Sequence, residues 1–272
     1  MNDKDCVAFL QWALPKLHFR WEGFRRVRAQ VCKRIHRRMQ GLGLEGQGDY
    51  RQYLEGHADE WLKLDDLTRV TISRFYRDKA MFAFLEQEVL PELARRAGAR
   101  GDRRLKALSL GCGSGEEPYT IALLWMLRIA SQFWDLGLEL DAIDADPHML
   151  SRAKEARYEY GTVKNLPEEL LQEGFVSREG LFELKPEFKR MVRFIQKDVR
   201  LELPAKTYDL VLCRNLVFTY YDEALQARLL DTISAVIKAD GVLVIGIHED
   251  LPKTMHDMQA WSDRLRIYRK PG

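Results

Sequence analysis

Residues 108–121 read LSLGCGSGEEPYTI. The apolar run at 105–110 predicts a β-strand, three glycines follow at Gly111, Gly113 and Gly115, and two glutamates then open a predicted helix. Glycines adopt backbone conformations that are closed to other residues, and they let a ligand approach the main chain. A strand, a glycine loop and a helix in this order predict a nucleotide-type binding site.

The charge after the loop separates the candidate ligands. The glycines alone are a weak signal, because dinucleotide-dependent oxidoreductases carry similar loops. A pyrophosphate binds a bare, positive helix N-terminus, and the carboxylates of Glu116 and Glu117 would repel it. S-adenosylmethionine has no phosphate and carries a sulfonium and an ammonium group. The sequence therefore predicts S-adenosylmethionine as the cofactor, with S-adenosylhomocysteine as its product, and an oxidoreductase is the least favoured class.

Short β-branched runs alternate with helical periodicity from residue 101 onward, which is typical of a mostly parallel α/β sheet. Further strands are expected at 138–144, 191–196, 208–215, 241–247 and, as a last edge strand, 265–270. Helices are expected from a cap at Asp78 to a bend or end at Pro91, and at 117–131, 147–157 and 223–238. Residues 160–190 fit neither pattern and are interpreted as an excursion above the sheet.

Acidic residues follow two of these strands. Asp144 and Asp146 lie at the expected carboxyl edge of the sheet, where open α/β folds bind ligands. Asp144 is predicted to accept hydrogen bonds from ribose hydroxyls, whereas Asp146 is predicted to cap the helix that begins at Pro147. Asp198 follows another strand, and it either reaches the adenine amino group or is an ordinary turn residue.

The first 70 residues differ from the rest of the chain in their pattern of apolar residues, which has the periodicity of helices and shows no convincing strand. Apolar residues recur at steps of three or four at Phe24, Val27, Val31, Ile35 and Met39. Between Lys16 and Arg38 there are nine basic side chains and one acid, so the local net charge is +8. The helix at 25–38 is interpreted either as a solvated basic face or as a docking surface for an acidic protein; nucleic acid is less favoured because aromatic residues do not interleave with the charges.

Length and composition exclude several classes of protein. The chain has 272 residues, 46% of them hydrophobic, and a formal net charge of +2, so there is no global signal for a polyanionic partner. There is no apolar run of roughly 18 residues and no signal-peptide pattern, so we expect a cytoplasmic protein without membrane insertion. The four cysteines show no disulfide framework, which favours a reduced setting and a packing role for Cys112 and Cys213. His248 and Glu249 are interpreted as a polar loop, and no metal site is predicted.

Five stretches carry a resemblance to a known family. They are VTISRFYRDKAMFAFLEQEVLPEL, SLGCGSGEEPYTIA, AIDADPHMLSRAKEARY, YDLVLCRNLVFTYYD and GVLVIGIHEDLP. In this order, over about residues 68–252, they resemble the CheR-type methyltransferases, which use S-adenosylmethionine to methylate glutamate side chains of bacterial chemotaxis receptors. The resemblance implies a class I S-adenosylmethionine methyltransferase domain (Rossmann-like, mostly parallel sheet) at 71–272, a helical domain at 1–70 and an inserted substrate-side β-subdomain at 160–190.

The resemblance also implies site residues. The cofactor site would comprise Thr71, Ser73, Arg77, Gly111, Gly113, Glu116, Glu117, Asp144, Asp198, Val199, Asn215 and Leu216. Arg77 would be catalytic as well, facing the incoming carboxylate. Glu116 or Glu117 would hold the cofactor's amino group, and Glu116 is favoured because it comes first after the glycines. Asp144 would bind the ribose.

Two positions depart from the family pattern. The family has a tyrosine four residues after Asn215, where this chain has Thr219; one inserted residue would restore the register with Tyr220 as the catalytic tyrosine, and we favour this. Asp198 replaces the usual asparagine. Thr219 keeps open a methyltransferase that acts on a small molecule or another protein group. A non-catalytic cofactor-sensing or nucleic-acid-binding module is a further alternative, but it should have lost Arg77 and Asn215.

Overall fold

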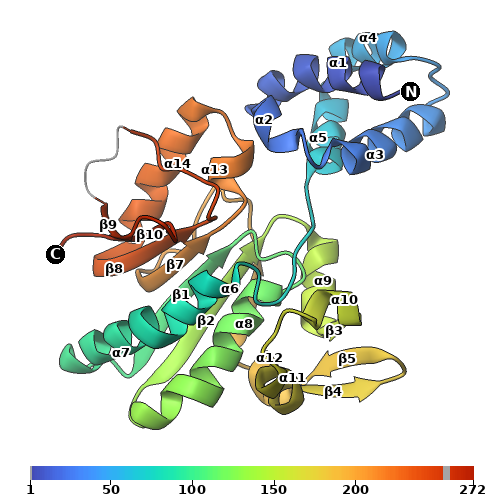
Figure 1. The fold of residues 1–272 in the computed structure, drawn as a ribbon. Coiled ribbons are helices and arrows are strands. Elements are labelled where there is room, and N and C mark those ends of the chain that lie inside the picture. Colours follow the sequence, from blue (N-terminus) through green and yellow to red (C-terminus); the bar gives the residue numbers. More distant parts are fainter. Residues whose placement is uncertain (1, 254–257) are drawn as a thin grey trace. The chain divides into compact units, whose positions relative to one another are not determined.

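The computed structural model describes residues 2–253 and 258–272 (Figure 1). The chain divides into two compact units: residues up to Val70 together with Thr219–Gln226, and Thr71–Phe218 together with Ala227–Gly272. The functional domains expected at 1–70 and 71–272 remain predictions, and the structure groups Thr219–Gln226 with the first unit. Among the described residues, no helix combines the length and the apolar character that a bilayer crossing requires.

The first unit is built from helices, as its periodicity predicts. They are α1 (Asp3–Ala13), α2 (Trp21–Phe24), α3 (Arg28–Gly41), α4 (Gln47–Gly56) and α5 (Ala58–Thr68), with a 3-10 turn at Leu14–Leu17. Asn2 starts α1, because its side chain accepts a hydrogen bond from the main-chain N–H of Asp5 at 2.8 Å. The apolar stripe of α3 faces inward: Val31, Ile35 and Met39 are all buried.

Two cysteines of the first unit correct a sequence prediction. The expectation of unpaired cysteines is wrong for Cys6 and Cys32, which form a disulfide between α1 and α3 with their Cα atoms 5.9 Å apart. The two residues are 26 positions apart, so only the packing of the two helices brings them together. Cys112 and Cys213 are free and buried, and burial raises the pKa of both thiols well above the usual value. A packing role for these two is consistent with that burial.

The second unit is organised around a 7-stranded sheet with the order β6-β2-β1-β7-β8-β10-β9. Its strands are β1 (Arg104–Leu110), β2 (Gly137–Asp144), β6 (Val192–Gln196), β7 (Tyr208–Cys213), β8 (Ile237–Ile245), β9 (Gln259–Ser262) and β10 (Ile267–Arg269). The strands β6 to β8 of this order run parallel, and β10 is antiparallel to both of its neighbours. This is the class I S-adenosylmethionine methyltransferase fold, as predicted. The prediction of an edge strand at 265–270 is wrong, because β9 covers β10.

The helices around this sheet show two further differences from expectation. They are α6 (Lys79–Phe84), α7 (Leu90–Ala99), α8 (Glu116–Leu124), α9 (Pro147–Glu155), α13 (Val217–Tyr220) and α14 (Glu223–Ala235). Pro91 does not end a helix: helical chain continues from α6 through a π-helical turn at Leu85–Val89 into α7. The N–H of Leu90, just before the proline, donates to the carbonyl of Leu85, as in a π-helix. Asp78 precedes α6 but makes no side-chain capping bond, because its carboxylate binds Arg214 instead.

The excursion after α9 forms a small sheet of its own. Three antiparallel strands lie in the order β3-β5-β4. The elements of this insertion are β3 (Arg157–Tyr158), α10 (Tyr160–Val163), α11 (Glu168–Gly174), β4 (Phe175–Arg178), β5 (Leu181–Leu184) and α12 (Pro186–Lys189). Strands of two to four residues are too short to give a periodic signal, which explains why the residues alone did not resolve them.

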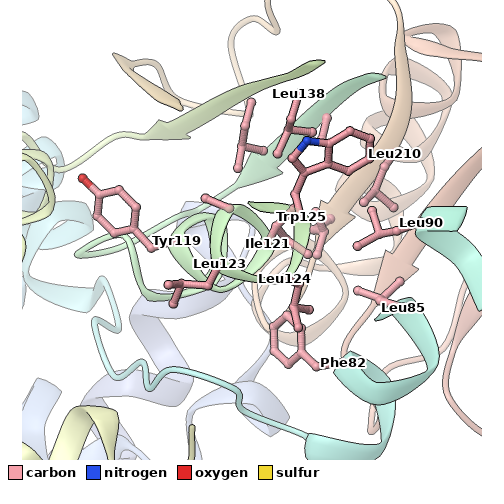
Figure 2. Packing of buried hydrophobic residues seen from close by; sticks show 14 of the residues in the cluster. Phe82, Leu85, Leu90, Tyr119, Ile121, Leu123, Leu124, Trp125, Leu138 and Leu210 are labelled. Atoms are coloured by element: carbon pink, nitrogen blue, oxygen red, sulfur yellow. The ribbon is translucent and has the colours of Figure 1, made fainter. Parts of the chain in front are cut away.

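One cluster of buried hydrophobic side chains packs α6, α7 and α8 against the main sheet (Figure 2). Phe82 and Leu90 come from the helices ahead of β1, and Trp125 follows α8. Leu138 and Leu210 come from β2 and β7. Each such side chain contributes roughly 1.5–3 kcal/mol when it is fully buried, so this packing holds the loop's two flanking elements in place.

Candidate active site

The glycine loop turns sharply between β1 and α8, with φ of +69° at Gly111 and +90° at Gly115. The N–H groups of Gly111 and Cys112 both donate to the carbonyl of Ile143, at 2.9 and 3.0 Å, and this fastens the loop to the end of β2. A Cβ atom on Gly111 would lie 2.7 Å from the side chain of Leu216. The position therefore requires glycine for its backbone angle and for space, and the predicted strand–loop–helix arrangement is confirmed.

Asp144 ends β2 directly beside the loop. Its Oδ2 accepts a hydrogen bond from the N–H of Gly113 at 2.8 Å, and its Oδ1 accepts one from the N–H of Asp146 at 2.9 Å. These two main-chain donors orient the Asp144 carboxylate at the edge of the glycine loop. Asp146 caps α9 through the N–H of His148 at 2.8 Å, as predicted.

The first of the two glutamates in α8 has an unsatisfied oxygen. Glu116 is only 3% exposed, and its Oε1 accepts a hydrogen bond from Ser114 Oγ at 3.0 Å. Its Oε2 is buried with no hydrogen-bond partner among the described residues, and it lies 3.8 Å from the place of a Cβ on Gly113. Burial raises the pKa of the Glu116 carboxyl, and this shift is opposed by hydrogen bonding from the main chain and Ser114, by the charge of Arg152 and by Ser73. A buried oxygen without a partner is costly, so the loop holds an acceptor that suits a cationic ligand.

The second glutamate is paired with a buried arginine. Glu117 accepts hydrogen bonds from Ser109 Oγ at 2.8 Å and from Arg214 Nη1 at 2.9 Å, one on each oxygen. Arg214 is buried, and its Nη2 donates to the carboxylate of Asp78 at 2.5 Å and to the carbonyl of Arg77 at 3.1 Å. Arg214 therefore joins the chain segment before α6 to the first turn of α8.

The segment before α6 contains three residues that are predicted to line the cofactor site: Thr71, Ser73 and Arg77. Ser73 lies beside the loop, with its Cβ 4.0 Å from the place of a Cβ on Gly113. The main-chain N–H of Tyr76 donates to Thr120 Oγ1 at 3.3 Å, which ties the segment to α8. Residues far apart in the sequence thus meet at the glycine loop.

Arg77, the third of these residues, has a half-buried side chain that is not committed to an acid. Its Nη1 lies 3.5 Å from the carbonyl of Ile72, a weak contact. Within the described part of the chain, no carboxylate pairs with Arg77, because the adjacent Asp78 pairs with Arg214. The guanidinium therefore keeps its capacity for a bidentate contact with an incoming carboxylate.

Asn215 and Leu216 follow β7 at the edge of the sheet that carries the loop. Asn215 has φ of +55°, and its N–H donates to Glu249 Oε2 at 3.0 Å. Glu249 is 2% exposed and also accepts a hydrogen bond from the N–H of Gly246 at 2.5 Å. The interpretation of Glu249 as an ordinary loop residue is therefore incomplete, because this carboxylate fixes the turn that carries Asn215. An acid placed just after a buried strand, at the carboxyl edge, was the available signal.

Comparison with known proteins decides the family. The family model described as CheR methyltransferase, SAM binding domain, matches residues 71–266. The chain belongs to the CheR methyltransferase family. It is an S-adenosylmethionine-dependent methyltransferase, as predicted, and the unsatisfied Oε2 of Glu116 beside Asp144 fits a cofactor with an ammonium group and ribose hydroxyls.

The relatives differ in how much of their length this chain covers. It is 30% identical to the chemotaxis protein methyltransferase of Escherichia coli, over 82% of this chain and 77% of that protein. It is 27% identical to the chemotaxis protein methyltransferase of Listeria innocua, over 75% and 74%. An uncharacterized 104.1 kDa protein of Rhodobacter capsulatus is 29% identical over 89% of this chain, which spans only 25% of that protein.

Asp198 stands where CheR-type proteins usually have asparagine, and here it is paired with a base. Its Oδ2 accepts a hydrogen bond from Arg200 Nη2 at 2.6 Å, and its Oδ1 accepts one from the N–H of Arg200 at 2.9 Å. Val199 is buried next to it. The N–H of Lys197 donates to the carbonyl of Asp144 at 3.1 Å, which brings this turn to the edge of the glycine loop. The pairing supports the turn-residue alternative, and the adenine contact remains a prediction.

The tyrosine of the CheR-type pattern falls in the segment that groups with the first unit. The ring of Tyr220 lies 5.1 Å from the ring of Phe24, and the carbonyl of Thr219 accepts a hydrogen bond from Arg20 Nε at 2.9 Å. Tyr221 is 5% exposed, whereas Tyr220 is half-buried. The burial of Tyr221 favours Tyr220 as the active-site tyrosine, and that role remains a prediction.

Proposed function

We propose that this methyltransferase forms γ-methyl esters on glutamate side chains of a receptor-like protein. Two relatives are named chemotaxis protein methyltransferases, which supports this class of acceptor. A glutamate has an unperturbed pKa of about 4.3, so the acceptor is ionised at neutral pH and needs no general base. What the reaction requires is a positioned carboxylate roughly 3 Å from the methyl carbon, in line with the bond that breaks.

The single observation that carries the proposal is the uncommitted guanidinium of Arg77. The adjacent acid, Asp78, is bound to Arg214, which also binds Glu117 of α8. Arg77 is therefore free to orient an acceptor carboxylate through two parallel N–H···O bonds, which a lysine cannot reproduce. In this role Arg77 desolvates and positions the nucleophile, and the hydroxyl of Tyr220 orients its second oxygen.

The cofactor, when bound, supplies the methyl group on its sulfonium. We assign its ammonium group to Glu116 and its ribose hydroxyls to Asp144. The other contacts are assigned to Thr71, Ser73, Gly111, Gly113, Asp198, Val199, Asn215 and Leu216. Glu117 holds Arg214 rather than the cofactor in this assignment, because its negative charge is already paired with the Arg214 guanidinium.

The acceptor protein is proposed to dock on the basic segment 25–38, whose residues from Arg28 onward form most of α3. Part of its charge is used within the first unit: Arg28 donates to Asp3 in α1 at 3.0 Å, and Arg38 donates to Glu60 in α5 at 2.9 Å. Lys33 and Arg37 are exposed one helical turn apart, and neither forms an ion pair within the described ranges. These two side chains offer a positive ridge to an acidic helical partner.

The charge-reversal variant Lys33→Glu/Arg37→Glu tests this docking surface. It should raise the KM for the protein acceptor at least several-fold and leave the dissociation constant of S-adenosylmethionine unchanged. Lys154→Glu, an exposed position on α9, is the matched control. An unchanged KM in the double variant would remove the docking surface from the proposal.

A cytoplasmic location is part of the proposal, because relatives of this chain are named chemotaxis protein methyltransferases. The Cys6–Cys32 disulfide is the observation against it, because such bonds are rare in reducing compartments. Thiol titration of the protein extracted under acid-quenched conditions distinguishes the two settings. If Cys6 and Cys32 do not react with a thiol reagent because they are joined as a disulfide in cells, a reducing cytoplasm is contradicted.

The acceptor chemistry is tested with methyl-labelled S-adenosylmethionine and a lysate of the cells that make the protein. A label that is bound to protein and released as methanol by mild base identifies a carboxyl ester, which is the expected result. A base-stable protein label, or a label only in the small-molecule fraction, would move the assignment to another acceptor group. Measurable cofactor binding without any label would indicate a cofactor-sensing module instead.

A further inference from the structure

Residues 18–20 of the first unit form main-chain hydrogen bonds with the segment that carries Tyr220, the predicted catalytic tyrosine. The N–H of Arg20 donates to the carbonyl of Tyr220 at 2.8 Å. The N–H of Asp222 donates to the carbonyl of His18 at 2.9 Å. The residues between these bonds, Phe19 and Tyr221, form an antiparallel β-bridge, and their rings stack 5.3 Å apart.

Side chains reinforce this main-chain pairing. Arg20 Nε donates to the carbonyl of Thr219 at 2.9 Å in a partly buried setting. Arg20 therefore binds two successive carbonyls, one through its backbone and one through its side chain. The ring of Phe24 meets the ring of Tyr220 edge to face, with centroids 5.1 Å apart. Both the backbone and the ring of Tyr220 are thus held by residues of α2 and the turn before it.

The close approach of α2 depends on a glycine. A Cβ atom on Gly23 would lie 2.3 Å from the carbonyl oxygen of Thr219 and 3.1 Å from Cδ1 of Tyr220. Real Cβ atoms do not approach a backbone oxygen to 2.3 Å, so a side chain here must push the 219–220 segment away. Gly23 has no left-handed φ, so it is needed for space and not for its backbone angle.

We infer that residues 18–24 are a clamp that positions Tyr220 for methyl transfer, with Arg20 and Gly23 as positioning residues. The inference rests on the proposed function, in which the Tyr220 hydroxyl orients the acceptor carboxylate. The clamp leads directly into α3, the helix proposed to dock the acceptor protein. Acceptor docking and tyrosine placement therefore belong to the same unit, whereas the cofactor loop belongs to the other.

Two substitutions of Arg20 separate a positioning role from a docking role. Methionine at this position, Arg20→Met, removes the side-chain donor while keeping an unbranched side chain of similar length. Arg20→Gln removes the charge but places an N–H donor at the same number of bonds from Cα as Nε. We expect Arg20→Met to lower kcat about 3- to 10-fold, the scale of one lost hydrogen bond, and Arg20→Gln to restore most of it.

The affinity for S-adenosylmethionine, measured by calorimetry, should stay within twofold of wild type in both variants. Arg103→Met, at an exposed arginine just before β1 and at the opposite end of that strand from the glycine loop, is the charge-loss control and should leave kcat unchanged. Equal losses in Arg20→Met and Arg20→Gln, seen mainly in the KM for the acceptor, would show that Arg20 acts through its charge. That outcome would overturn the clamp.

A double-variant cycle shows whether Arg20 acts through the tyrosine. If Tyr220→Phe lowers kcat, the clamp predicts that adding Arg20→Met to it causes no further loss. A fully additive loss would overturn the clamp and leave the role of Tyr220 standing. An unchanged kcat in Tyr220→Phe alone would show that the proposed role of Tyr220 is wrong, and the clamp would fail with it.

Gly23→Ala tests the same clamp by displacement. It should lower kcat several-fold while cofactor affinity persists, because it pushes on Thr219 and Tyr220. Gly41→Ala is its matched control, since a Cβ there meets nothing within 4 Å. Far-UV circular dichroism and the cofactor titration confirm that each variant is folded. A folded Gly23→Ala protein with wild-type kcat would contradict the inference.

Discussion

Replacing Glu116 by glutamine changes one atom of the side chain that we assign to the cofactor's ammonium group. In the free protein, Oε2 of this carboxylate is buried without a hydrogen-bond partner among the described residues, and Oε1 accepts a hydrogen bond from Ser114. A hydrogen bond to a charged group is worth about 1.5–3 kcal/mol net. Each 1.4 kcal/mol is tenfold, so Glu116→Gln should weaken S-adenosylmethionine binding by roughly 10- to 150-fold.

The same substitution, Glu116→Gln, should weaken cofactor binding but should not lower the stability of the cofactor-free protein. Burial raises the pKa of Glu116 above its ordinary value of 4.5, so the folded state holds this proton more tightly than the unfolded state. The resulting contribution to stability is fully present below pH 4.5 and is lost as the pH rises through the folded pKa. At neutral pH the ionised carboxylate is therefore a cost that glutamine removes, and the unfolding midpoint of the cofactor-free variant should not fall.

Calorimetric titration and thermal unfolding, each with and without S-adenosylmethionine, measure both effects. Glu155→Gln removes the same charge from an exposed position on α9 and should change neither quantity. Wild-type affinity should decline as the pH falls toward the raised pKa of Glu116, and the variant should lack this dependence. An affinity within twofold of wild type in Glu116→Gln would refute the assignment of the ammonium group to this residue.

Three further predictions concern other parts of the chain. Arg77→Ala should lower the methyl-transfer rate by about 10²-fold with a smaller loss of cofactor affinity, and Arg77→Lys should not restore it; initial rates within a few-fold of wild type would contradict the role. Gly111→Ala should cost about 1–2 kcal/mol of stability for its left-handed φ, measured by denaturant unfolding against the control Gly98→Ala, where a Cβ meets nothing within 4 Å. Reducing the bond between Cys6 and Cys32, which are 26 residues apart, should cost about 3.5 kcal/mol by the chain-entropy relation; identical unfolding with and without reductant would mean that the thiols are not joined.

Local signals in the sequence were sufficient for the parallel part of the fold. The apolar run before Gly111 and the acid at Asp144 both end strands at the carboxyl edge, and each position follows from short-range patterning. The helices of the first unit could also be predicted, because apolar residues recur along α3 with helical periodicity. Resemblance to a family supplied the rest of the candidate site.

Features that depend on packing between segments far apart in the chain could not be predicted from the sequence. Nothing near Cys6 indicates that α1 and α3 bring it to Cys32. The capping role expected of Asp78 was wrong because Arg214, 136 residues later, takes its carboxylate. Glu249 was interpreted only as part of a polar loop for the same reason, because its partner Asn215 lies 34 residues away. A local propensity predicts what a side chain does only when no distant group competes for it.

The pair Glu116 and Glu117 shows why the distinction matters for function. Both acids stand at a helix N-terminus, where a negative charge is stabilised, so propensity treats them alike. Arg214 arrives 97 residues later and satisfies Glu117, and nothing comparable satisfies Oε2 of Glu116 among the described residues. If both had been paired, the loop would be an ordinary structural turn. We propose that this difference selects a cationic ligand. It arises only when the strands that carry the loop and Arg214 lie side by side in the sheet.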